Sequence, residues 1–420
     1  SFIFLMLLQT QPYFSIPIIV CCETHNCSIH RDTLPAQKAF TEIAQSLHTI
    51  PLLRPKFYML LHTKNTGCLF SKKVYTEREK SYEFADRRKL MNDYNPFSGS
   101  GRWYKGNLHS HSTVSDGTYS PKELKEIYKQ HGYSFLALSD HRIFHIHNEL
   151  NEPDFLIYPS MEGNMTAPED MPGCGGYRAY HMQVLCDPEA AASHPLEDGE
   201  RVEAPERTSW EQYYASAQKF INTMRERGNL VTVNHPIWSR LQYEDISALE
   251  GFFAMEIYNS ECALDGMDTG EGTVFWDLLL RKGKKIWGIA TDDCHNRNNP
   301  NEKAPVGSAR FSSCRGWVQV YASELSVPAL CRSLREGRFY ASTGPEIFQY
   351  EVIGGEVHLK CSPVQKIELI GEPCRAQGYS DPEAKLTEAS WKLDGRERYI
   401  RVQVTDASGK KAWTNPIFFN

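Results

Sequence analysis

The chain has 420 residues, a net charge of −6, and contents of 41% hydrophobic and 23% charged residues. This length exceeds what one hydrophobic core usually serves, so we expect two domains and an additional irregular segment. The composition is ordinary for a soluble globular protein, and the negative charge excludes the broad basic surface that nucleic-acid binding requires. Twelve cysteines without paired spacing favour reduced thiols and a cytoplasmic location over a disulfide framework.

Residues 1–101 are interpreted as an N-terminal extension of doubtful structure that ends in a Gly/Ser-rich linker at 95–101. Its apolar run Phe2 to Leu8 is shorter than the roughly 18 residues of a membrane span, so we expect no transmembrane helix. Three interpretations stay open: a weak leader, an accessory extension, or upstream sequence wrongly joined to the gene. One group with the residue types of a zinc site lacks the usual spacing: Cys21, Cys22, Cys27 and His30.

Residues 102–315 alternate predicted helices with predicted strands. The stretch "SPKELKEIYKQHG" predicts a helix in which Ser120 is the N-cap, Glu123 closes a capping box and Gly132 ends the last turn. We expect His131 to lie in that turn as a cation and not as a metal ligand.

A second helix before Gly228 is predicted by apolar residues at three- and four-residue steps, which we assign to the core. These residues are Trp210, Tyr213, Tyr214, Ala217, Phe220, Ile221 and Met224.

Short apolar runs predict the strands of the same region: "FLALSDH", "FLIYPSMEG", "YHMQVLC", "LVTVNHP", "FFAMEIYN" and "KIWGIATDDCH". Nearly continuous apolar strands that alternate with helices favour a parallel sheet covered on both faces, or a barrel. Most runs carry polar residues at or near their ends. Because sites assemble at the C-terminal strand ends of such folds, we expect one shared pocket.

From residue 316 to residue 420 the pattern changes to several short strands separated by Gly, Pro and Asp turns. This pattern predicts a small β-rich, sandwich-like C-terminal domain. Its single histidine, His358, is expected on the surface of a strand.

Six histidines and three carboxylates near the predicted strand ends are the candidate metal ligands. They are His109, His111, Asp116, His141, Glu162, His181, His235, Asp293 and His295. Any one of these histidines alone would be better explained by hydrogen bonding. Burying the whole set without a metal would cost about 1–3 kcal/mol for each unsatisfied group. Imidazole and carboxylate ligands suit zinc, manganese or iron, and nine of them suffice for two or three ions.

The motifs "NLHSHSTVSDG", "ALSDHR", "MEG", "YHMQV", "NHP" and "TDDCH" occur in this order over residues 102–312 and resemble those of the polymerase and histidinol phosphatase (PHP) superfamily. The resemblance implies a distorted (β/α)7 barrel that holds two or three divalent metal ions for hydrolysis, most often of phosphate esters. It implies one ion held by His109, His111, Glu162 and Asp293, a second held by Glu162, His181 and His235, and a third held by Asp116, His141 and His295.

Two C-terminal stretches, "GRFYASTGP" and "AWTNPIFF", resemble the CehA/McbA-like branch of that superfamily, which includes enzymes that cleave carbamate esters and amides. The long insertion "NMTAPEDMPGCGGYRAY" before His181 and the N-terminal extension depart from shorter members of the family.

These features predict a metal-dependent hydrolase, most readily a phosphoesterase in which water bridging two metals becomes the attacking hydroxide. Asp292 is a candidate for protonating the leaving group, although orienting the ligand Asp293 is the favoured role. Arg178, Arg297 and Arg310 are candidates for binding an anionic phosphoester. We expect a small-molecule substrate, no nucleic acid and no membrane, while the oligomeric state stays open.

Two alternative functions remain open at this point. The same metal centre could hydrolyse a carbamate ester or an amide, or the chain could be a non-catalytic metal-bound scaffold with a binding β domain. The assignments of four residues are open as well. A second His-x-His, His145 and His147, offers two further ligands that the nine-residue set does not require. Glu256 and Asn259 could line the pocket or form hydrogen bonds inside the barrel.

Overall fold

The computed structural model describes residues 2–9, 15–22, 60–63, 66–70, 92–167, 178–203, 209–266, 269–299, 302–373 and 377–419. The chain divides into two compact units, Ser1–Tyr82 and Glu83–Asn420. The first unit contains two antiparallel pairs, β1 (Phe2–Gln9) with β2 (Ser15–Cys22) and β3 (Leu60–Thr63) with β4 (Thr66–Phe70). Of the unusual zinc group, Cys27 and His30 lie outside the described residues.

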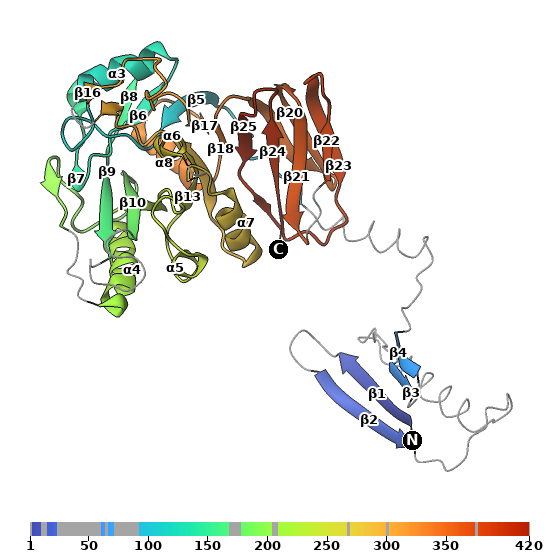
Figure 1. Ribbon diagram of the computed structural model, residues 1–420. Coiled ribbons are helices and arrows are strands. Elements are labelled where there is room, and N and C mark those ends of the chain that lie inside the picture. The colour runs from blue at the N-terminus through green and yellow to red at the C-terminus, as the bar shows by residue number, and fades with distance from the viewer. Residues whose placement is uncertain are drawn as a thin grey trace. The chain divides into compact units, whose positions relative to one another are not determined.

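The second unit is a mixed α/β structure with many strands and few helices (Figure 1). Its described helices are α3 (Pro121–Gln130), α4 (Trp210–Glu226), α5 (Tyr243–Ser247), α6 (Ser260–Asp265), α7 (Thr273–Arg281), α8 (Val327–Arg335) and the 3-10 turn η1 (Asn148–Leu150). None of the described helices combines the length and the apolar character that crossing a bilayer would need.

The capping residues predicted for the first helix are confirmed in α3. The Ser120 hydroxyl accepts a hydrogen bond from the Glu123 backbone N–H, and the Glu123 carboxylate accepts one from the Ser120 N–H. The ring of His131 lies 2.7 Å from the Ile127 carbonyl oxygen at the helix end, away from the proposed ligands. The sequence therefore located both ends of this helix correctly.

Helix α4 confirms most of the second helical prediction. Its buried hydrophobic residues in the described structure are Tyr213, Ala217, Phe220, Ile221 and Met224. The assignment of Tyr214 to the core was wrong, because this ring is 39% exposed and its hydroxyl accepts a hydrogen bond from Arg178. The side chain of Trp210 lies outside the described structure.

The second unit contains two large β-sheets. A five-stranded sheet has the order β14 (Trp287–Thr291), β13 (Ala254–Asn259), β12 (Asn229–Val233), β10 (Ala179–Cys186) and β9 (Ser160–Thr166). A ten-stranded sheet has the order β22 (Gln377–Ser380), β21 (Lys366–Glu372), β24 (Tyr399–Thr405), β25 (Lys411–Thr414), β18 (Phe339–Ser342), β17 (Trp317–Ala322), β5 (Arg102–Asn107), β6 (Phe135–Ala137) and β8 (Leu156–Tyr158), with β26 (Ile417–Phe418) on β24. Short pairs are β7 (Ile143–Phe144) with β11 (Glu200–Arg201) and β15 (Arg297–Asn299) with β16 (Glu302–Lys303).

All six predicted apolar runs form strands, but the parallel arrangement holds only in part. Strands β12, β13 and β14 are parallel, as are β5, β6 and β8, whereas β10 runs antiparallel to both β9 and β12. No helix separates β9 from β10 in the described chain, and antiparallel neighbours need no crossover connection. This reversal places His181, near the start of β10, at the same edge as residues that follow the ends of β12 and β14.

The described strands do not form a closed barrel, so the seven-unit barrel stays a prediction. Two isolated bridges join the sheets: Ser110 pairs with Cys294 beyond the ends of β5 and β14, and His141, which follows β6, pairs with Glu162 on β9. The ten-stranded sheet continues across residue 315, because β17 pairs with β5 on one side and with β18 on the other. The proposed division at residue 315 therefore falls within one hydrogen-bonded sheet.

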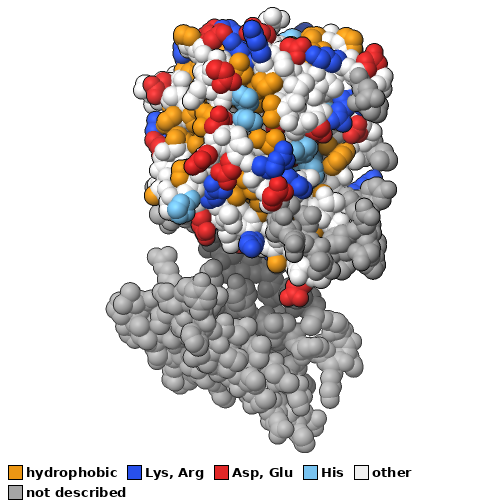
Figure 2. Space-filling view, turned by 90° about the vertical axis from the view of Figure 1, so that its left-hand side faces the viewer, with side chains coloured by type: hydrophobic (Ala, Val, Ile, Leu, Met, Phe, Trp, Pro, Cys, Tyr) orange, Lys and Arg blue, Asp and Glu red, His pale blue; other side chains and the backbone are white. Residues whose placement is uncertain are grey.

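The C-terminal part buries a hydrophobic cluster between two layers of strands. The layer of β19 (Ile347–Ile353), β20 (Glu356–Val364) and β23 (Leu386–Lys392) packs on β21, β24 and β25 through Tyr350, Leu359, Ile367 and Val402. Figure 1 shows these strands grouped apart from α3 and α4. The face shown in Figure 2 carries acidic and basic side chains intermixed, without a broad basic area.

Candidate metal centre

The nine predicted ligands come from segments far apart in the sequence and line or lie beneath one pocket. His109, His111 and Asp116 follow β5, His141 follows β6, and Glu162 lies on β9. The others are His181 on β10, His235 after β12, and Asp293 and His295 after β14. The pocket has a volume of about 300 Å³. Its described lining residues are Asp116, His141, Glu162, His181, His235, Trp238, Glu261, Cys262, Asp265, Asp293, His295, Arg297 and Arg310.

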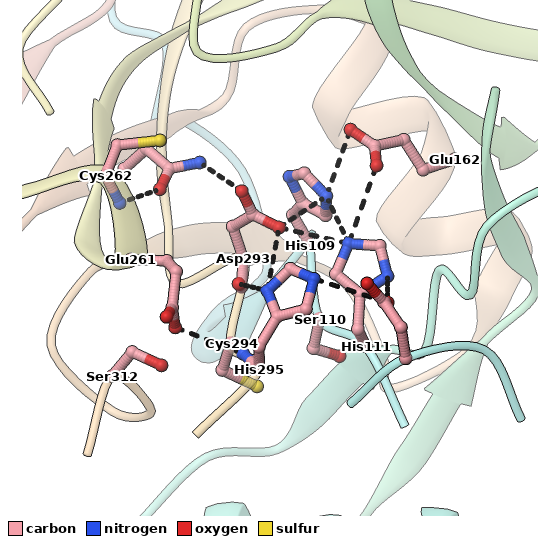
Figure 3. Close-up of polar contacts among 12 residues, drawn as sticks. His109, Ser110, His111, Glu162, Glu261, Cys262, Asp293, Cys294, His295 and Ser312 are labelled. Carbon is pink, nitrogen blue, oxygen red and sulfur yellow. Dashed lines mark hydrogen bonds and ion pairs between the residues drawn. The ribbon is translucent and has the colours of Figure 1, made fainter. Parts of the chain in front are cut away.

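The deepest group consists of His109, His111, Glu162 and Asp293, whose side chains converge (Figure 3). The Nε2 atoms of His109 and His111 are 3.1 Å apart and lie 3.2 and 3.0 Å from Oδ1 of Asp293. The same nitrogen atoms lie 3.3 and 3.5 Å from the two carboxylate oxygens of Glu162. Four ligand atoms arranged tetrahedrally at about 2.0–2.1 Å from a metal are separated by about 3.3–3.4 Å. The observed spacing fits one ion.

Two further groups adjoin this one. Oε1 of Glu162 lies 3.3 Å from Nδ1 of His181 and 3.4 Å from Nε2 of His235. Oδ1 of Asp116 lies 3.3 Å from Nε2 of His295 and 3.7 Å from Nε2 of His141. Each set has ligand atoms close enough together to hold an ion. Because Glu162 belongs to two of the groups, its carboxylate is placed to bridge neighbouring ions.

Hydrogen bonds orient several of these rings. Glu256, which is buried, contacts Nδ1 of His109 through Oε1 at 2.7 Å, and its Oε2 accepts from the backbone N–H of His235 at 2.8 Å. Nδ1 of His235 lies 2.9 Å from the hydroxyl of Ser239. A carboxylate or hydroxyl on Nδ1 leaves Nε2 facing the cluster, as is usual for metal-binding histidines.

The backbone is unusual at two of the predicted ligands. His235 and Asp293 have φ angles of 22° and 51°, a region that residues other than glycine seldom occupy. Strained backbone of this kind persists where the surrounding structure holds it, and it concentrates at functional sites. At both positions the backbone turns just after a strand, which directs the side chain into the pocket.

The electrostatics of the cluster also suit a cation. Burial acts to raise the pKa of Asp116, but hydrogen bonding to His295 and the nearby charges of His295, His111 and His141 lower it overall. Burial, together with the charges of His295 and His141, lowers the pKa of His111 to about 4. Burial opposes charging of His295, yet Asp116 and Asp293 raise its pKa to about 9. Metal ions bind ionised carboxylates and neutral imidazoles, and they take the place of the protons that these groups would otherwise bind. The cluster brings both kinds of ligand together.

Buried polar atoms without hydrogen bonds provide an independent test of fit. Within the described structure, three such atoms lack a hydrogen bond of good geometry, Nδ1 of His111, Nδ1 of His141 and Oε2 of Glu162, although the last two lie only 3.1 Å from each other. Buried polar groups are nearly always satisfied, and each unsatisfied one costs about 1–3 kcal/mol. All three atoms belong to predicted ligands, so the hydrogen bonds of the protein alone do not complete this buried polar centre.

Asp292 is placed differently from its neighbour Asp293. It is buried outside the pocket and accepts hydrogen bonds from the backbone N–H groups of Cys314, Arg315 and Gly316, and from Tyr128 and Asn107. Burial raises its pKa to about 6, while these hydrogen bonds act in the opposite direction. Both oxygens are occupied by donors, which favours the positioning role over proton transfer.

The three candidate arginines do not all lie at the pocket. Arg297 and Arg310 line the pocket, and Nη2 of Arg297 lies 3.0 Å from Oδ2 of Asp116. Arg178 is not among the described lining residues and interacts with Tyr214 and Asp245. The geometry therefore brings two of the three to the pocket.

Sequence reasoning left Glu256 undecided and did not select Glu261 or Trp238. Glu256 lies on β13 beneath the ligands, and its position in "AMEIYN" at a strand end was the available signal. The carboxylate of Glu261 accepts a hydrogen bond from the His295 backbone N–H, and burial raises its pKa. Trp238 follows His235 in the turn after β12. No spacing in the sequence distinguishes either residue from its neighbours.

Nine chains of solved structures are similar to this chain, and two of them are the following. One is a two-domain protein from Bacteroides vulgatus containing a predicted PHP-like metal-dependent phosphoesterase, with 14% identity, coverage of 79% of this chain and 90% of the other, and a TM-score of 0.36. The second, from Bifidobacterium adolescentis, is a candidate metal-dependent phosphoesterase with 14% identity, coverage of 48% and 91%, and a TM-score of 0.32. TM-scores this low do not establish a common fold. No family model and no curated protein matches the chain.

Proposed function

We propose that this chain is a metal-dependent hydrolase of the PHP type that cleaves a phosphoester. The observation that carries this proposal is the convergence of nine histidine and carboxylate side chains at one pocket. Two or three divalent ions would be held by three groups of residues. These groups are His109, His111, Glu162 and Asp293; Glu162, His181 and His235; and Asp116, His141 and His295. Bound ions of this kind polarise substrate oxygens and lower the pKa of coordinated water to about 7.

Residues around the proposed ligands have separate tasks. Glu256 and Ser239 fix the ring orientations of His109 and His235. Asp292 joins residues 314–316 to the C-terminal end of β14, next to Asp293, by hydrogen bonds. Arg297 and Arg310 are placed at the pocket to bind anionic oxygens of the substrate, for which a guanidinium offers paired hydrogen bonds.

We also propose membership of the CehA/McbA-like branch, on the two C-terminal motifs. Support comes from their pairing, since Tyr340 of "GRFYASTGP" lies opposite Thr414 of "AWTNPIFF" between β18 and β25. Asn415 of the second motif binds the Gly288 backbone N–H at the start of β14, the strand that leads to Asp293. The second motif thus contacts the strand that leads to the proposed ligand Asp293.

Metal analysis and a substrate panel test the proposed function together. Purified full-length chain should contain two to three equivalents of transition metal by elemental analysis. With manganese or zinc supplied, it should hydrolyse phosphomonoesters or diesters in a panel that also contains aryl carbamates and amides. Activity restricted to carbonyl substrates would reject the phosphoesterase and favour the carbamate or amide hydrolase. Metal binding without any hydrolysis, together with binding of a polymer or protein by the β-rich part, would favour the scaffold.

A further inference from the structure

Trp238 differs in kind from every other described residue that lines the pocket. The other described lining residues all carry ionisable side chains, whether histidine, carboxylate, arginine or cysteine. Trp238 is 41% exposed, although a large aromatic ring gains most by being buried. An exposed apolar surface inside an otherwise charged pocket marks a place where part of a ligand can be accommodated.

The indole ring lies beside the second group of proposed ligands. Its centroid is 5.1 Å from that of the His235 ring and 5.9 Å from that of the His181 ring, with interplanar angles of 85° and 73°. The tryptophan ring therefore stands nearly perpendicular to both imidazoles. Its exposed surface remains after these contacts, so covering the two histidines does not account for it.

A hydrogen bond holds this ring in place. Nε1 of Trp238 donates to Oδ2 of Asp265 at 3.2 Å, and Oδ1 of Asp265 lies 3.6 Å from Nη2 of Arg310. Arg310 also donates from Nη1 to the Leu264 carbonyl oxygen at 3.1 Å. Trp238 and Arg310 lie in two different turns and Asp265 is the last residue of α6, and together we call them the aromatic rim. An indole fixed by such a network can stack with a planar group at little cost in side-chain entropy.

We propose that the aromatic rim selects substrates in which a planar aromatic group lies next to the scissile bond, so that this group stacks on Trp238 while the reacting group occupies the metal centre. This inference rests on the proposed hydrolase function and specifies its substrate class. Trp238 is then a specificity residue, and Asp265 is a positioning residue that acts through it.

A matched pair of substrates tests the proposal. Benzyl phosphate and cyclohexylmethyl phosphate are similar in size and both release a primary alcohol, but only the first has a planar ring. We expect wild-type kcat/KM to favour the benzyl ester by about threefold to tenfold, the range of aromatic pair interactions. Trp238→Phe should keep most of this preference and Trp238→Leu should remove it. The exposed aromatic Phe348, on β19, provides the control Phe348→Leu, which should leave the ratio unchanged.

Binding gives a readout that does not depend on turnover. By calorimetry on the metal-loaded full chain, benzylphosphonate should bind more tightly than cyclohexylmethylphosphonate, and this difference should vanish in Trp238→Leu. Asp265→Ala should reduce the difference, because the ring loses its hydrogen bond, and it serves as a second variant if Trp238→Leu does not fold. Metal content should equal that of the wild type in all of these variants.

Several outcomes would overturn the proposal. A wild-type ratio near one, or a preference that persists in Trp238→Leu, would show that Trp238 does not select the substrate. Loss of metal in Trp238→Phe would show instead that the ring holds the neighbouring metal-binding histidines in place. If the wild type hydrolyses no phosphate ester, the phosphoesterase itself fails. The same ratio measured with benzyl and cyclohexylmethyl carbamates then decides the role of Trp238 separately.

Discussion

The chain contains two His-x-His pairs with the same spacing and very different surroundings. The first pair, His109 and His111, is fully buried, and its Nε2 atoms lie 3.1 Å apart beside Glu162 and Asp293. The second pair, His145 and His147, stacks ring on ring at 4.7 Å near the surface.

Each histidine of the second pair has its own carboxylate partner. His145 lies 3.3 Å from Asp198 and His147 lies 3.1 Å from Glu149, and both carboxylates are largely exposed. Among the described residues, neither histidine of this pair belongs to a group of three or more ligand atoms within 4.8 Å of one another. The spacing of two histidines is therefore not enough for a metal site; carboxylates from other strand ends must also reach them.

The largest expected effect comes from removing a ligand of the first pair or its carboxylate. His111→Ala and Asp293→Ala should lose bound metal and any hydrolytic activity together, because each deletes one of four closely spaced ligand atoms. Elemental analysis and the substrate panel measure the two losses. His145→Ala and His147→Ala are the matched controls and should retain both. Full activity in His111→Ala, or metal loss in His145→Ala, would abolish the distinction between the pairs.

A smaller effect is expected from Glu256, which contacts the first pair as a buried carboxylate, whereas the carboxylates at the second pair are exposed. Glu256→Gln should weaken metal binding by about 10- to 100-fold, because the amide cannot accept from all the donors that the carboxylate serves. Competition with a chromophoric chelator measures the affinity. Glu271→Gln, at an exposed carboxylate paired with Lys411, is the control. Equal affinities for these two variants would remove Glu256 from its positioning role.

Asp292, which is buried next to the proposed ligand Asp293, should contribute to folding stability. Asp292→Asn places an amide N–H₂ among buried donors and should lower the free energy of unfolding by about 2–4 kcal/mol, since at least one donor group loses its acceptor. Urea unfolding of the full chain measures this change. An unaltered unfolding midpoint would mean that the hydrogen bonds from residues 314–316 to Asp292 do not contribute to the stability of the folded chain.

The smallest effect is expected at the second pair, where the interactions are exposed. Hydrogen bonding to the Ile146 backbone N–H, together with His145, lowers the pKa of Asp198 below its ordinary value of 3.8. Ionised Asp198 therefore stabilises the folded state above about pH 4, and this contribution is lost as the pH falls through the lowered pKa.

Asp198→Asn should accordingly cost less than about 1 kcal/mol at pH 7. The difference from the wild type should shrink as the pH is lowered below 4. Urea unfolding at several pH values measures this dependence. A difference that stays constant with pH would show that the charge of Asp198 contributes nothing.

Local sequence signals determined the helices and strands of this protein. Ser120 and Glu123 specified the start of α3 because capping uses groups three residues apart. The six apolar runs specified their strands because burial on both faces requires continuous apolar residues. The nine candidate ligands were also selected from sequence, since polar residues after such strands meet at one sheet edge in this class of fold.

Contacts between residues far apart in the sequence decided the features that the sequence alone did not predict. The sequence could not distinguish the second histidine pair from the first, because this difference depends on whether Glu162 and Asp293 lie alongside. It did not reveal that β10 runs antiparallel, that Glu256 supports His109, or that the Trp238 ring is held by Asp265. Each of these features depends on atoms that are distant along the chain. Residue spacing governs contacts within one turn or strand, and only tertiary packing decides which strand ends come within 4 Å of one another.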